Sequence, residues 1–507
     1  MKRKKMSSNT MKEKIICTTN KYWIYLLWIA SLIFVSLVDF TQVTGDRNVV
    51  KASFLVLFLI IFIGYLMQGK MEYDQKLIRI IILGSFVLRL IFVLFHNYNF
   101  SYHDLGSLVK GTETTYKDGH LGYIQYLYSN GQLPDFDPRT VWSFYQPPFY
   151  YIVASTFMKI NTILGLDMKV ALENLQMLTM LFATMTIQVG YKILKEFRLS
   201  ERTTTFAFLI VAFHPYFITG GATPNNDMLS ILFMFLAILY AIRWYKNSTY
   251  KEILLLALSI GLGMMTKISV GLVAPAVAVL FLIKFIKEKA YAKYLKQFIL
   301  FGIICIPLGM FWPIRNMILY DMPLLYVQEI KSTSDQYLDL GVWKRINPFD
   351  FTGYDYPGLS YDVDKDYNIW SVMLKSSMFD ELWIDKTLLY EIFIGTVLVF
   401  INAILAVAAL ICGIINDVKG KQQDRSINCF KMILYITIMG SYIKFCFNYP
   451  MICSMNFRYI VPVLLIGAVN VGVYLDSEYK NEYLARTAEC VTVAFAVMSA
   501  FVYMFIL

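Results

Sequence analysis

Long apolar runs recur along this chain and alternate with short polar segments. A run of about 17–25 apolar residues can cross a bilayer as an α-helix. We expect thirteen transmembrane helices near residues 22–38, 52–67, 78–96, 172–194, 203–220, 228–244, 252–267, 269–286, 298–314, 391–415, 430–446, 458–475 and 488–507. The pattern predicts an all-α polytopic membrane protein with no separate soluble domain.

The composition agrees with a membrane protein. Hydrophobic residues make up 57% of the chain and charged residues only 16%, whereas soluble domains are about 25% charged. The net charge of +10 comes from basic residues at the ends of apolar runs, so nucleic-acid binding is not predicted. The basic N-terminus followed by the run 22–38 indicates a retained signal-anchor, because no small-residue cleavage site follows it.

The positions of Lys and Arg predict the topology. Basic residues mark cytoplasmic loops of membrane proteins, and with the N-terminus inside, every predicted inner loop is basic: 68–77, 192–202, 243–251, 284–297, 416–431 and 476–487. The two long loops then lie outside, and the second is rich in acidic residues. We expect a multi-pass protein of the cell membrane, with a cytoplasmic N-terminus and an external C-terminus.

This topology divides the chain into five parts. They are the N-terminus with three helices (1–96), an external catalytic loop with interfacial helices (97–171), helices four to nine (172–314), an external loop or lid (315–390) and helices ten to thirteen (391–507).

The first external loop contains side chains suited to acid–base chemistry. Asp104, beside His103, can act as a general base toward a hydroxyl, although an acid at this place also suits a helix N-cap. Asp118 and His120 open a segment that looks like a turn and an interfacial helix, so their role is open between structure and acceptor contact.

The later part of this loop has a second group of candidates. Asp135-Phe136-Asp137 is a DxD pattern, which in soluble transferases holds a metal and a nucleotide sugar. However, Asp137-Pro138 is also a turn signal. We therefore favour a role in ordering the loop near Arg139. Gln146-Pro147-Pro148 predicts a helix start. Tyr145 and Gln146 would then lie beside the catalytic loop.

Three cations and one acid lie at predicted outer ends of helices. Asp227 follows a turn, where it serves either the turn or a functional site. Lys267 would cost about 2.5–3.5 kcal/mol at the bilayer centre, which favours a functional role such as binding a lipid phosphate. Arg315 and Arg458 lie where the positive-inside rule disfavours arginine, so they predict a bound anion. The alternative is pairing with the acidic loop.

Several common motifs are missing from the sequence. It has no Walker loop, GxGxxG, HExxH or nucleophile elbow. ATP-driven transport and zinc-type proteolysis therefore have no support.

The order of these motifs resembles the GT-C superfamily of membrane glycosyltransferases. It is most similar to the branch of protein O-mannosyltransferases, the lipid A aminoarabinose transferase and family-39-like bacterial enzymes. The resemblance covers roughly residues 78–330, with a weaker match near 456–462. It rests on Asp104, the Gln-Pro-Pro-aromatic segment, Asn226-Asp227, the GLGMMTK segment ending at Lys267, and Arg315-Asn316. The family often shows Asp-Glu in the first loop, where this chain has His103-Asp104-Leu105.

The resemblance implies a polyprenyl-phosphate sugar as donor and a hydroxyl acceptor on a protein, lipid or glycan, with inversion at the sugar. Asp104 would be the general base, and His103 or Asp227 would assist or orient it. The donor phosphate would meet Lys267, Arg315 and Arg458. The scheme needs no cofactor or metal, although some superfamily relatives use a divalent metal.

Two other functions compete with this hypothesis. A polysaccharide polymerase or ligase would use a pyrophosphate-linked oligosaccharide on a different fold. A transporter of lipid-linked sugars would require polar residues in several mid-membrane helices, whereas in this sequence the polar residues gather at one predicted face of the membrane.

Overall fold

The computed structural model describes residues 22–37, 73–96, 98, 111–112, 115–328, 332–420 and 424–506. Helices dominate these residues, and the predicted all-α fold is confirmed. The extended structure described is one antiparallel pair, β1 (Gly111–Thr112) with β2 (Thr115–Tyr116), and a bridge between Tyr337 and Met451.

Most helices coincide with the predicted apolar runs. They are Tyr22–Leu37, α3 (Tyr73–Phe95), α7 (Met168–Glu196), α8 (Glu201–Ala212), α9 (Tyr216–Thr219), α10 (Asp227–Asn247), α11 (Tyr250–Met264), α12 (Ala274–Glu288), α13 (Tyr291–Tyr320), α16 (Leu389–Lys419), α17 (Arg425–Asn448), α18 (Pro462–Asp476) and α19 (Glu482–Phe501).

Eight helices in the described part are long and apolar enough to cross a membrane, and α8 with the segment through Ala222 makes a ninth if this pair, bent by 58°, is one span. Tyr22–Leu37 and α18 are apolar but shorter. The predicted span 52–67 lies outside the described residues. The total of thirteen therefore stays a prediction.

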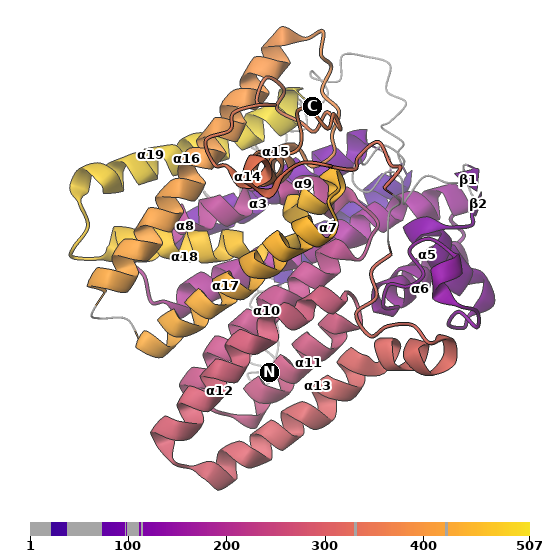
Figure 1. Ribbon diagram of the computed structural model, residues 1–507, viewed down its shortest axis with the longest axis horizontal. Coiled ribbons are helices and arrows are strands. Elements are labelled where there is room, and N and C mark those ends of the chain that lie inside the picture. Colours follow the sequence, from indigo (N-terminus) through magenta and orange to yellow (C-terminus); the bar gives the residue numbers. More distant parts are fainter. Residues whose placement is uncertain are drawn as a thin grey trace, which may run out of the picture.

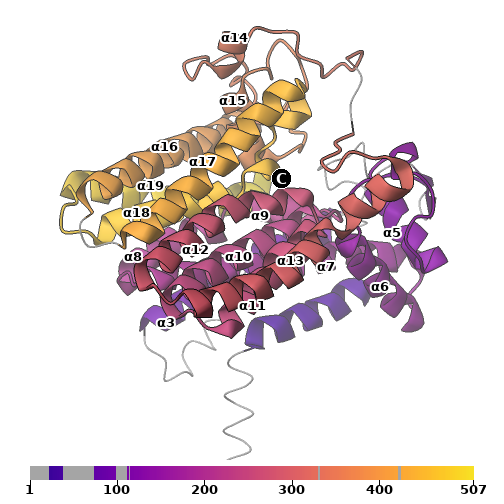
Figure 2. The ribbon, with the colours of Figure 1, turned by 60° about the horizontal axis from the view of Figure 1, so that its bottom comes forward.

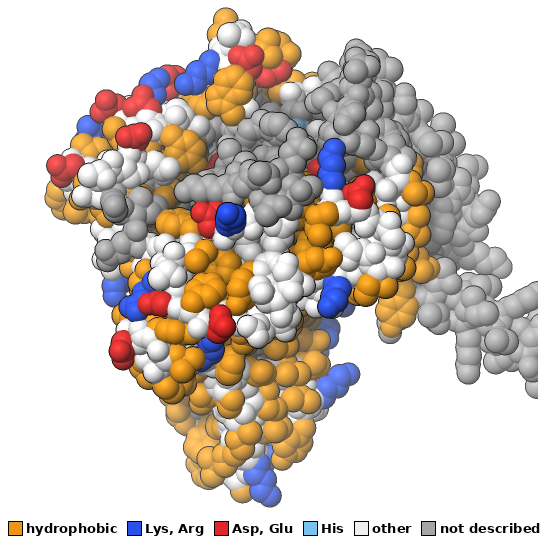
Figure 3. Space-filling model, turned by 90° about the vertical axis from the view of Figure 1, so that its right-hand side faces the viewer, with side chains coloured by type: hydrophobic (Ala, Val, Ile, Leu, Met, Phe, Trp, Pro, Cys, Tyr) orange, Lys and Arg blue, Asp and Glu red, His pale blue; other side chains and the backbone are white. Residues whose placement is uncertain are grey.

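The helices form two neighbouring groups. Figure 1 shows α10, α11, α12 and α13 side by side, and Figure 2 shows α16, α17, α18 and α19 grouped beyond them. On α13, Leu295, Ile299, Ile303 and Ile306 are more than half exposed. Figure 3 shows a broad hydrophobic surface on one side of the molecule, with Lys and Arg side chains toward its lower end. An exposed apolar surface of this kind suits contact with lipid.

Glycines allow α11 to pack closely at the start of the segment that carries Lys267. A Cβ atom on Gly261 would lie 2.9 Å from Cβ of Leu308 in α13. A Cβ atom on Gly263 would lie 2.5 Å from the side chain of Val270 in the 3-10 helix η5 (Ile268–Val273). Both contacts are too short for any side chain, so glycine fixes how α11 meets its neighbours.

The two long loops contain short helices. The first holds α5 (Gly119–Asn130), the 3-10 turn η3 (Pro138–Thr140) and α6 (Phe149–Ile163), as the sequence predicts for the segments after Asp118 and Pro148. The second holds α14 (Val342–Ile346) and α15 (Ile369–Phe379), which lie beyond the ends of α16 and α17 (Figure 2). The second loop is called the lid below.

A buried ion pair holds the lid together. Nζ of Lys375 lies 2.6 Å from Oδ1 of Asp366 and donates to the carbonyl of Gly353 at 2.9 Å. The side chains are 1% and 0% exposed. Oδ2 of Asp366 accepts three more hydrogen bonds from Ser360 and Tyr361. Both buried charges are thus matched inside the lid, while its buried apolar residues such as Ile369 and Val372 belong to the common hydrophobic core.

Candidate functional site

Asp227 begins α10 and is almost fully buried. Its backbone N–H donates to Oδ1 of Asn225 at 3.0 Å, which closes the tight turn before the helix. The side chain of Asp227 is only 3% exposed. A carboxylate at a helix N-terminus is favoured by the helix dipole, but one that is this buried also needs cationic partners.

Lys267 is the first of these partners. It ends the GLGMMTK segment in an extended conformation just before η5, and its ammonium forms an ion pair with Oδ1 of Asp227. Nζ also lies 5.4 Å from the centre of the Tyr459 ring. The close packing of α11 at Gly261 and Gly263 thus places Lys267 against the start of α10.

Arg458 is the second partner and comes from a distant part of the chain. Its Nη1 lies 4.0 Å from Oδ2 of Asp227, and its side chain is 8% exposed. Nη2 donates to the hydroxyl of Tyr459 at 3.1 Å. Asp227, Lys267, Arg458 and Tyr459 are called the charged cluster below. It unites three segments that the sequence analysis identified separately.

The lid fixes the turn that carries Arg458. Oδ1 of Asn456 accepts from the backbone N–H of Arg458 at 2.9 Å, and its Nδ2 donates to Asp380 at 3.0 Å. Asp380 has a positive φ of 52°, a conformation that L-residues rarely adopt. Burial raises the pKa of the lid residue Tyr361 well above its usual value, while the charge of Arg458 acts in the opposite direction. The lid thus faces the charged cluster.

Gln146 joins the first external loop to the cluster. Nδ2 of Asn226 donates to the carbonyl of Thr266 at 2.9 Å and contacts Oε1 of Gln146 at 3.4 Å. The backbone N–H of Phe149 donates to the carbonyl of Met265 at 2.9 Å. Residues beside Asp227 and Lys267 therefore hold the start of α6 in place.

Tyr145 and His120 contact residues near the cluster rather than the cluster itself in the contacts described here. The carbonyl of Tyr145 accepts from Nε1 of Trp312 at 2.9 Å, and its hydroxyl accepts from Nε2 of Gln146 at 2.9 Å. Nδ1 of buried His120 lies 2.7 Å from the hydroxyl of Tyr151. Burial raises the pKa of Tyr151 well above its usual value, and the nearby charge of Asp227 adds to the increase. His120 therefore bonds to a tyrosine whose pKa responds to the charge of Asp227.

The described contacts of Arg315 lie outside the charged cluster, and Asp118 lies at the start of α5. Arg315 donates to the carbonyl of Pro134 and to Oδ1 of Asn316, and its guanidinium lies 4.9 Å from the Trp312 ring. It therefore ties α13 to the first loop, and its predicted role at the donor phosphate stays a prediction. Asp118 precedes α5 without a side-chain capping hydrogen bond.

Within the DxD pattern, Asp137 orders the loop. Its carboxylate bonds to Arg139 at 2.7 Å, and Arg139 also donates to the carbonyl of Tyr320 at 2.6 Å. The hydrogen bond from Arg139 lowers the pKa of Asp137 below its usual value. Asp135 accepts a long bond from the hydroxyl of Tyr126 at 3.3 Å. These contacts agree with the loop-ordering interpretation.

His103 and Asp104 lie outside the described residues. Within the described ranges, no group of three or more His, Cys, Asp or Glu side chains is arranged to hold a metal ion.

Comparisons with known proteins give a partial match. Residues 146–313 match the dolichyl-phosphate-mannose-protein mannosyltransferase family. This segment contains Gln146, Asp227 and Lys267, but ends before Arg315 and Arg458. No curated protein matches the chain. The resemblance to GT-C membrane glycosyltransferases is thereby confirmed over the matched segment.

Two solved structures share low overall similarity with the chain. ArnT from Cupriavidus metallidurans bound to undecaprenyl phosphate aligns at 12% identity over 86% of this chain and 76% of that chain, with a TM-score of 0.45. The apo oligosaccharyltransferase from Archaeoglobus fulgidus aligns at 11% identity over 86% of this chain and 56% of that one, with a TM-score of 0.47. The alignment thus covers little more than half of the archaeal protein.

Several side chains that build the site have no role assigned to them from the sequence. Asn226 and Asn456 each join two segments through one side-chain amide, and Tyr459 contacts Arg458. All three lie within two residues of a charge that the sequence did identify, and this adjacency was the available signal. Asp380, which accepts from Asn456, belongs to the acidic loop that was the alternative partner of the arginines, but no pattern distinguishes it from the other acids there.

Proposed function

We propose that this protein is a membrane glycosyltransferase that moves a sugar from a polyprenyl-phosphate donor to an acceptor hydroxyl at the outer face of the cell membrane. The match of residues 146–313 to a mannosyltransferase family supports the class of enzyme. Undecaprenyl phosphate, the lipid bound to ArnT, is an example of the lipid part of such a donor. The acceptor is a protein, lipid or glycan hydroxyl.

The observation that carries the proposal is the meeting of two cations from distant segments at one buried carboxylate. Lys267 and Arg458 both lie against the carboxylate of Asp227. Asp227 thus holds both cations in one place, at the predicted outer end of the helices. Cations placed in this way suit a lipid phosphate, because a phosphate leaving group needs stabilisation as negative charge develops on it.

The reaction that fits is a single displacement with inversion. The acceptor oxygen forms a bond to the anomeric carbon while the bond from that carbon to the phosphate oxygen breaks. The phosphate leaves as polyprenyl phosphate near Lys267 and Arg458, and the hydroxyl proton passes to a base. Asp227 is paired with two cations, which suits a residue that positions them more than one that takes a proton. Asp104, assisted by His103, is the base in this proposal.

Three matched variants test the roles. Membranes receive radiolabelled polyprenyl-phosphate hexoses, and transfer is followed with wild type, Asp104→Asn, Arg458→Gln and the control Lys251→Gln. A lost base lowers transfer by about 10²–10⁴-fold with little change in donor KM. A lost phosphate contact raises donor KM by about tenfold or more, since a hydrogen bond to a charged group contributes about 1.5–3 kcal/mol. Equal transfer by Asp104→Asn and wild type would rule out Asp104.

The competing functions give different results in the same membranes. A polymerase or ligase would transfer only from a pyrophosphate-linked oligosaccharide. A transporter would move labelled lipid across the bilayer without forming a new glycosidic bond.

A further inference from the structure

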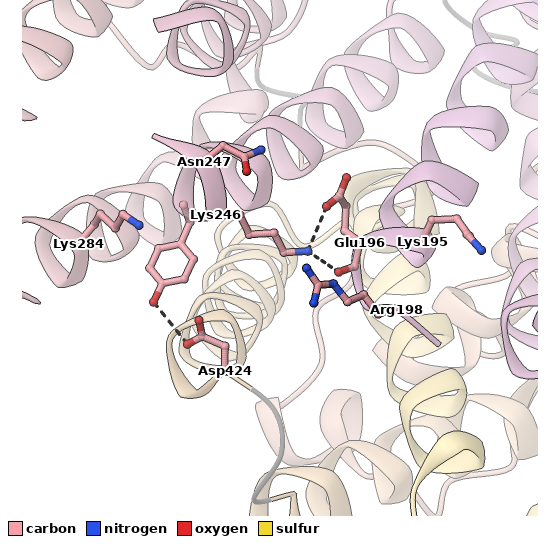
Figure 4. A pocket seen from close by; sticks show the side chains of 8 residues that line it. Lys195, Glu196, Arg198, Lys246, Asn247, Lys284 and Asp424 are labelled. Atoms are coloured by element: carbon pink, nitrogen blue, oxygen red, sulfur yellow. Dashed lines mark hydrogen bonds and ion pairs between the residues drawn. The ribbon is translucent and has the colours of Figure 1, made fainter. Parts of the chain in front are cut away.

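A second cationic site lies far from the charged cluster. A cavity of about 500 Å³ is lined by four cations and two carboxylates, namely Lys195, Glu196, Arg198, Lys246, Lys284 and Asp424. They come from the ends of α7, α10 and α12 and from the residue before α17. Figure 4 shows Lys246 and Arg198 both pointing toward Glu196 at the centre of this group. Four segments that are distant in sequence thus converge here.

This cavity and the charged cluster lie at opposite ends of one helix. α10 begins at Asp227 and ends at Asn247, which lines the cavity. Its 21 residues span about 30 Å at 1.5 Å per residue, which is the thickness of the hydrocarbon core of a bilayer. The four loops that contribute to the cavity are ones that the charge pattern predicts to be cytoplasmic. The cavity is therefore at the level of the inner headgroups.

The local charges leave this cavity positive. Lys195 pairs with Glu201, and Lys284 pairs with Glu288. Glu196 alone is shared by Lys246, at 3.0 Å, and Arg243, at 2.7 Å. Together with Arg198, these two cations face two carboxylates, those of Glu196 and Asp424, so the group has one positive charge in excess.

Arg198 is the most accessible cation of this group. It is exposed, has a left-handed φ of 54°, and makes no ion pair with any residue in the described ranges. Nζ of Lys287 donates to Ser426 at 2.8 Å, which places a further cation near Asp424. Arg198 and Lys246 thus both line the cavity, and Lys287 is a further cation nearby.

Exposed apolar side chains lie on two of the helices beside the cavity. They are Leu282 and Ile286 of α12, and Met432 and Ile436 of α17, each about half exposed or more. These two helices contact each other. A cationic cavity beside an exposed apolar surface suits a ligand with a charged head and an apolar tail.

The simplest alternative is that these basic residues only set the topology. That role requires Lys and Arg in the inner loops, but not their convergence. Lys251 satisfies the same rule on the neighbouring helix α11, yet it is exposed and does not line the cavity. Topology also gives no reason for an unpaired Arg198 in a left-handed conformation beside Lys246.

We propose that this cavity binds the phosphate group of an anionic phospholipid of the inner leaflet, with its acyl chains along the exposed apolar side chains of α12 and α17. Arg198 and Lys246 are the principal contacts, since Arg suits phosphate through its planar fork. The site is independent of sugar transfer, so its test does not depend on the proposed function.

The test is a titration of the purified full chain in detergent, followed by native mass spectrometry. The probes are dioctanoyl phosphatidylglycerol and, as its soluble headgroup, glycerol phosphate. The variants are Arg198→Gln, Arg198→Lys and the control Lys251→Gln. Arg198 is exposed and unpaired, so its replacement leaves folding intact, and the thermal melting point of each variant checks this.

We expect wild type and Lys251→Gln to bind the lipid equally and Arg198→Gln to bind about fivefold more weakly, the effect of about 1 kcal/mol per basic residue near a lipid surface. Arg198→Lys should recover part of the affinity. Glycerol phosphate should bind at least tenfold more weakly than the lipid. Equal losses in Arg198→Gln and Lys251→Gln would overturn the site, and equal binding of glycerol phosphate would overturn its assignment to a lipid.

Discussion

The charged cluster allows the energetic role of Asp227 to be predicted from geometry. The side chains of Asp227, Lys267 and Arg458 are 3%, 16% and 8% exposed, so water screens their charges weakly. At the 4.0 Å that separates Arg458 from Asp227, two unit charges attract by about 4 kcal/mol at an effective dielectric constant of about 20. Removing one member of a buried pair costs about 3–5 kcal/mol, because the other charge loses its partner.

Asp227→Asn should therefore lower the free energy of unfolding by about 3–5 kcal/mol, since it removes the carboxylate that both cations contact. Lys267→Gln should cost less, about 1–3 kcal/mol, because Arg458 still compensates the carboxylate. The double variant should be no less stable than Asp227→Asn alone. The two substitutions are then non-additive, with a coupling at least as large as the cost of Lys267→Gln alone, about 1–3 kcal/mol.

The assay is equilibrium unfolding of the detergent-solubilised protein by increasing fractions of a denaturing detergent, followed by tryptophan fluorescence. Lys251→Gln is the matched control and should change the free energy by less than about 0.5 kcal/mol. Additive losses in the double variant, or an Asp227→Asn variant as stable as the control, would refute the interpretation that one carboxylate holds both cations.

Three further predictions concern the loops around the cluster. Asn226→Ala should destabilise the protein by about 1–3 kcal/mol and should increase hydrogen exchange at the start of α6, whereas unchanged exchange would show that the amide does not hold this segment. Lys375→Met should leave Asp366 as a buried unpaired charge and open the lid to proteolysis, and adding Asp366→Asn should restore protection. The hydrogen bond from Arg139 lowers the pKa of Asp137 below its usual value of 3.8. The pair therefore stabilises the loop above pH 3.8, and this contribution is lost as the pH falls through the lowered pKa. The loop should be cleaved faster at about pH 3 than at about pH 5, and Arg139→Gln should abolish the difference.

The sequence predicted the helical architecture because apolar runs of membrane length have few structural alternatives. It also predicted the helices after Asp118 and Pro148. The lengths of individual helices were harder, because α11 is only 15 residues long and α8 joins its neighbour at a bend of 58°. Packing against neighbouring helices decides such details, and a hydropathy pattern does not contain it.

The charged cluster was partly predictable for a different reason. Asp227, Lys267 and Arg458 were each conspicuous because a charge at an apolar helix end is costly, but their mutual contact depends on how α10, α11 and the turn before α18 meet. Arg315 met the same criterion, yet the structure places it against the carbonyl of Pro134. Neutral connectors such as Asn226 and Asn456 carry no cost that a sequence reveals.

The measurement that tests the central claim most directly is sugar transfer by membranes containing the wild-type protein, supplied in parallel with polyprenyl monophosphate hexoses and with pyrophosphate-linked oligosaccharides. Membranes that lack the protein serve as the baseline. We predict labelled product from a monophosphate donor, with release of polyprenyl phosphate and inverted anomeric configuration. Transfer from the pyrophosphate donors alone, or none from either class, would contradict the account.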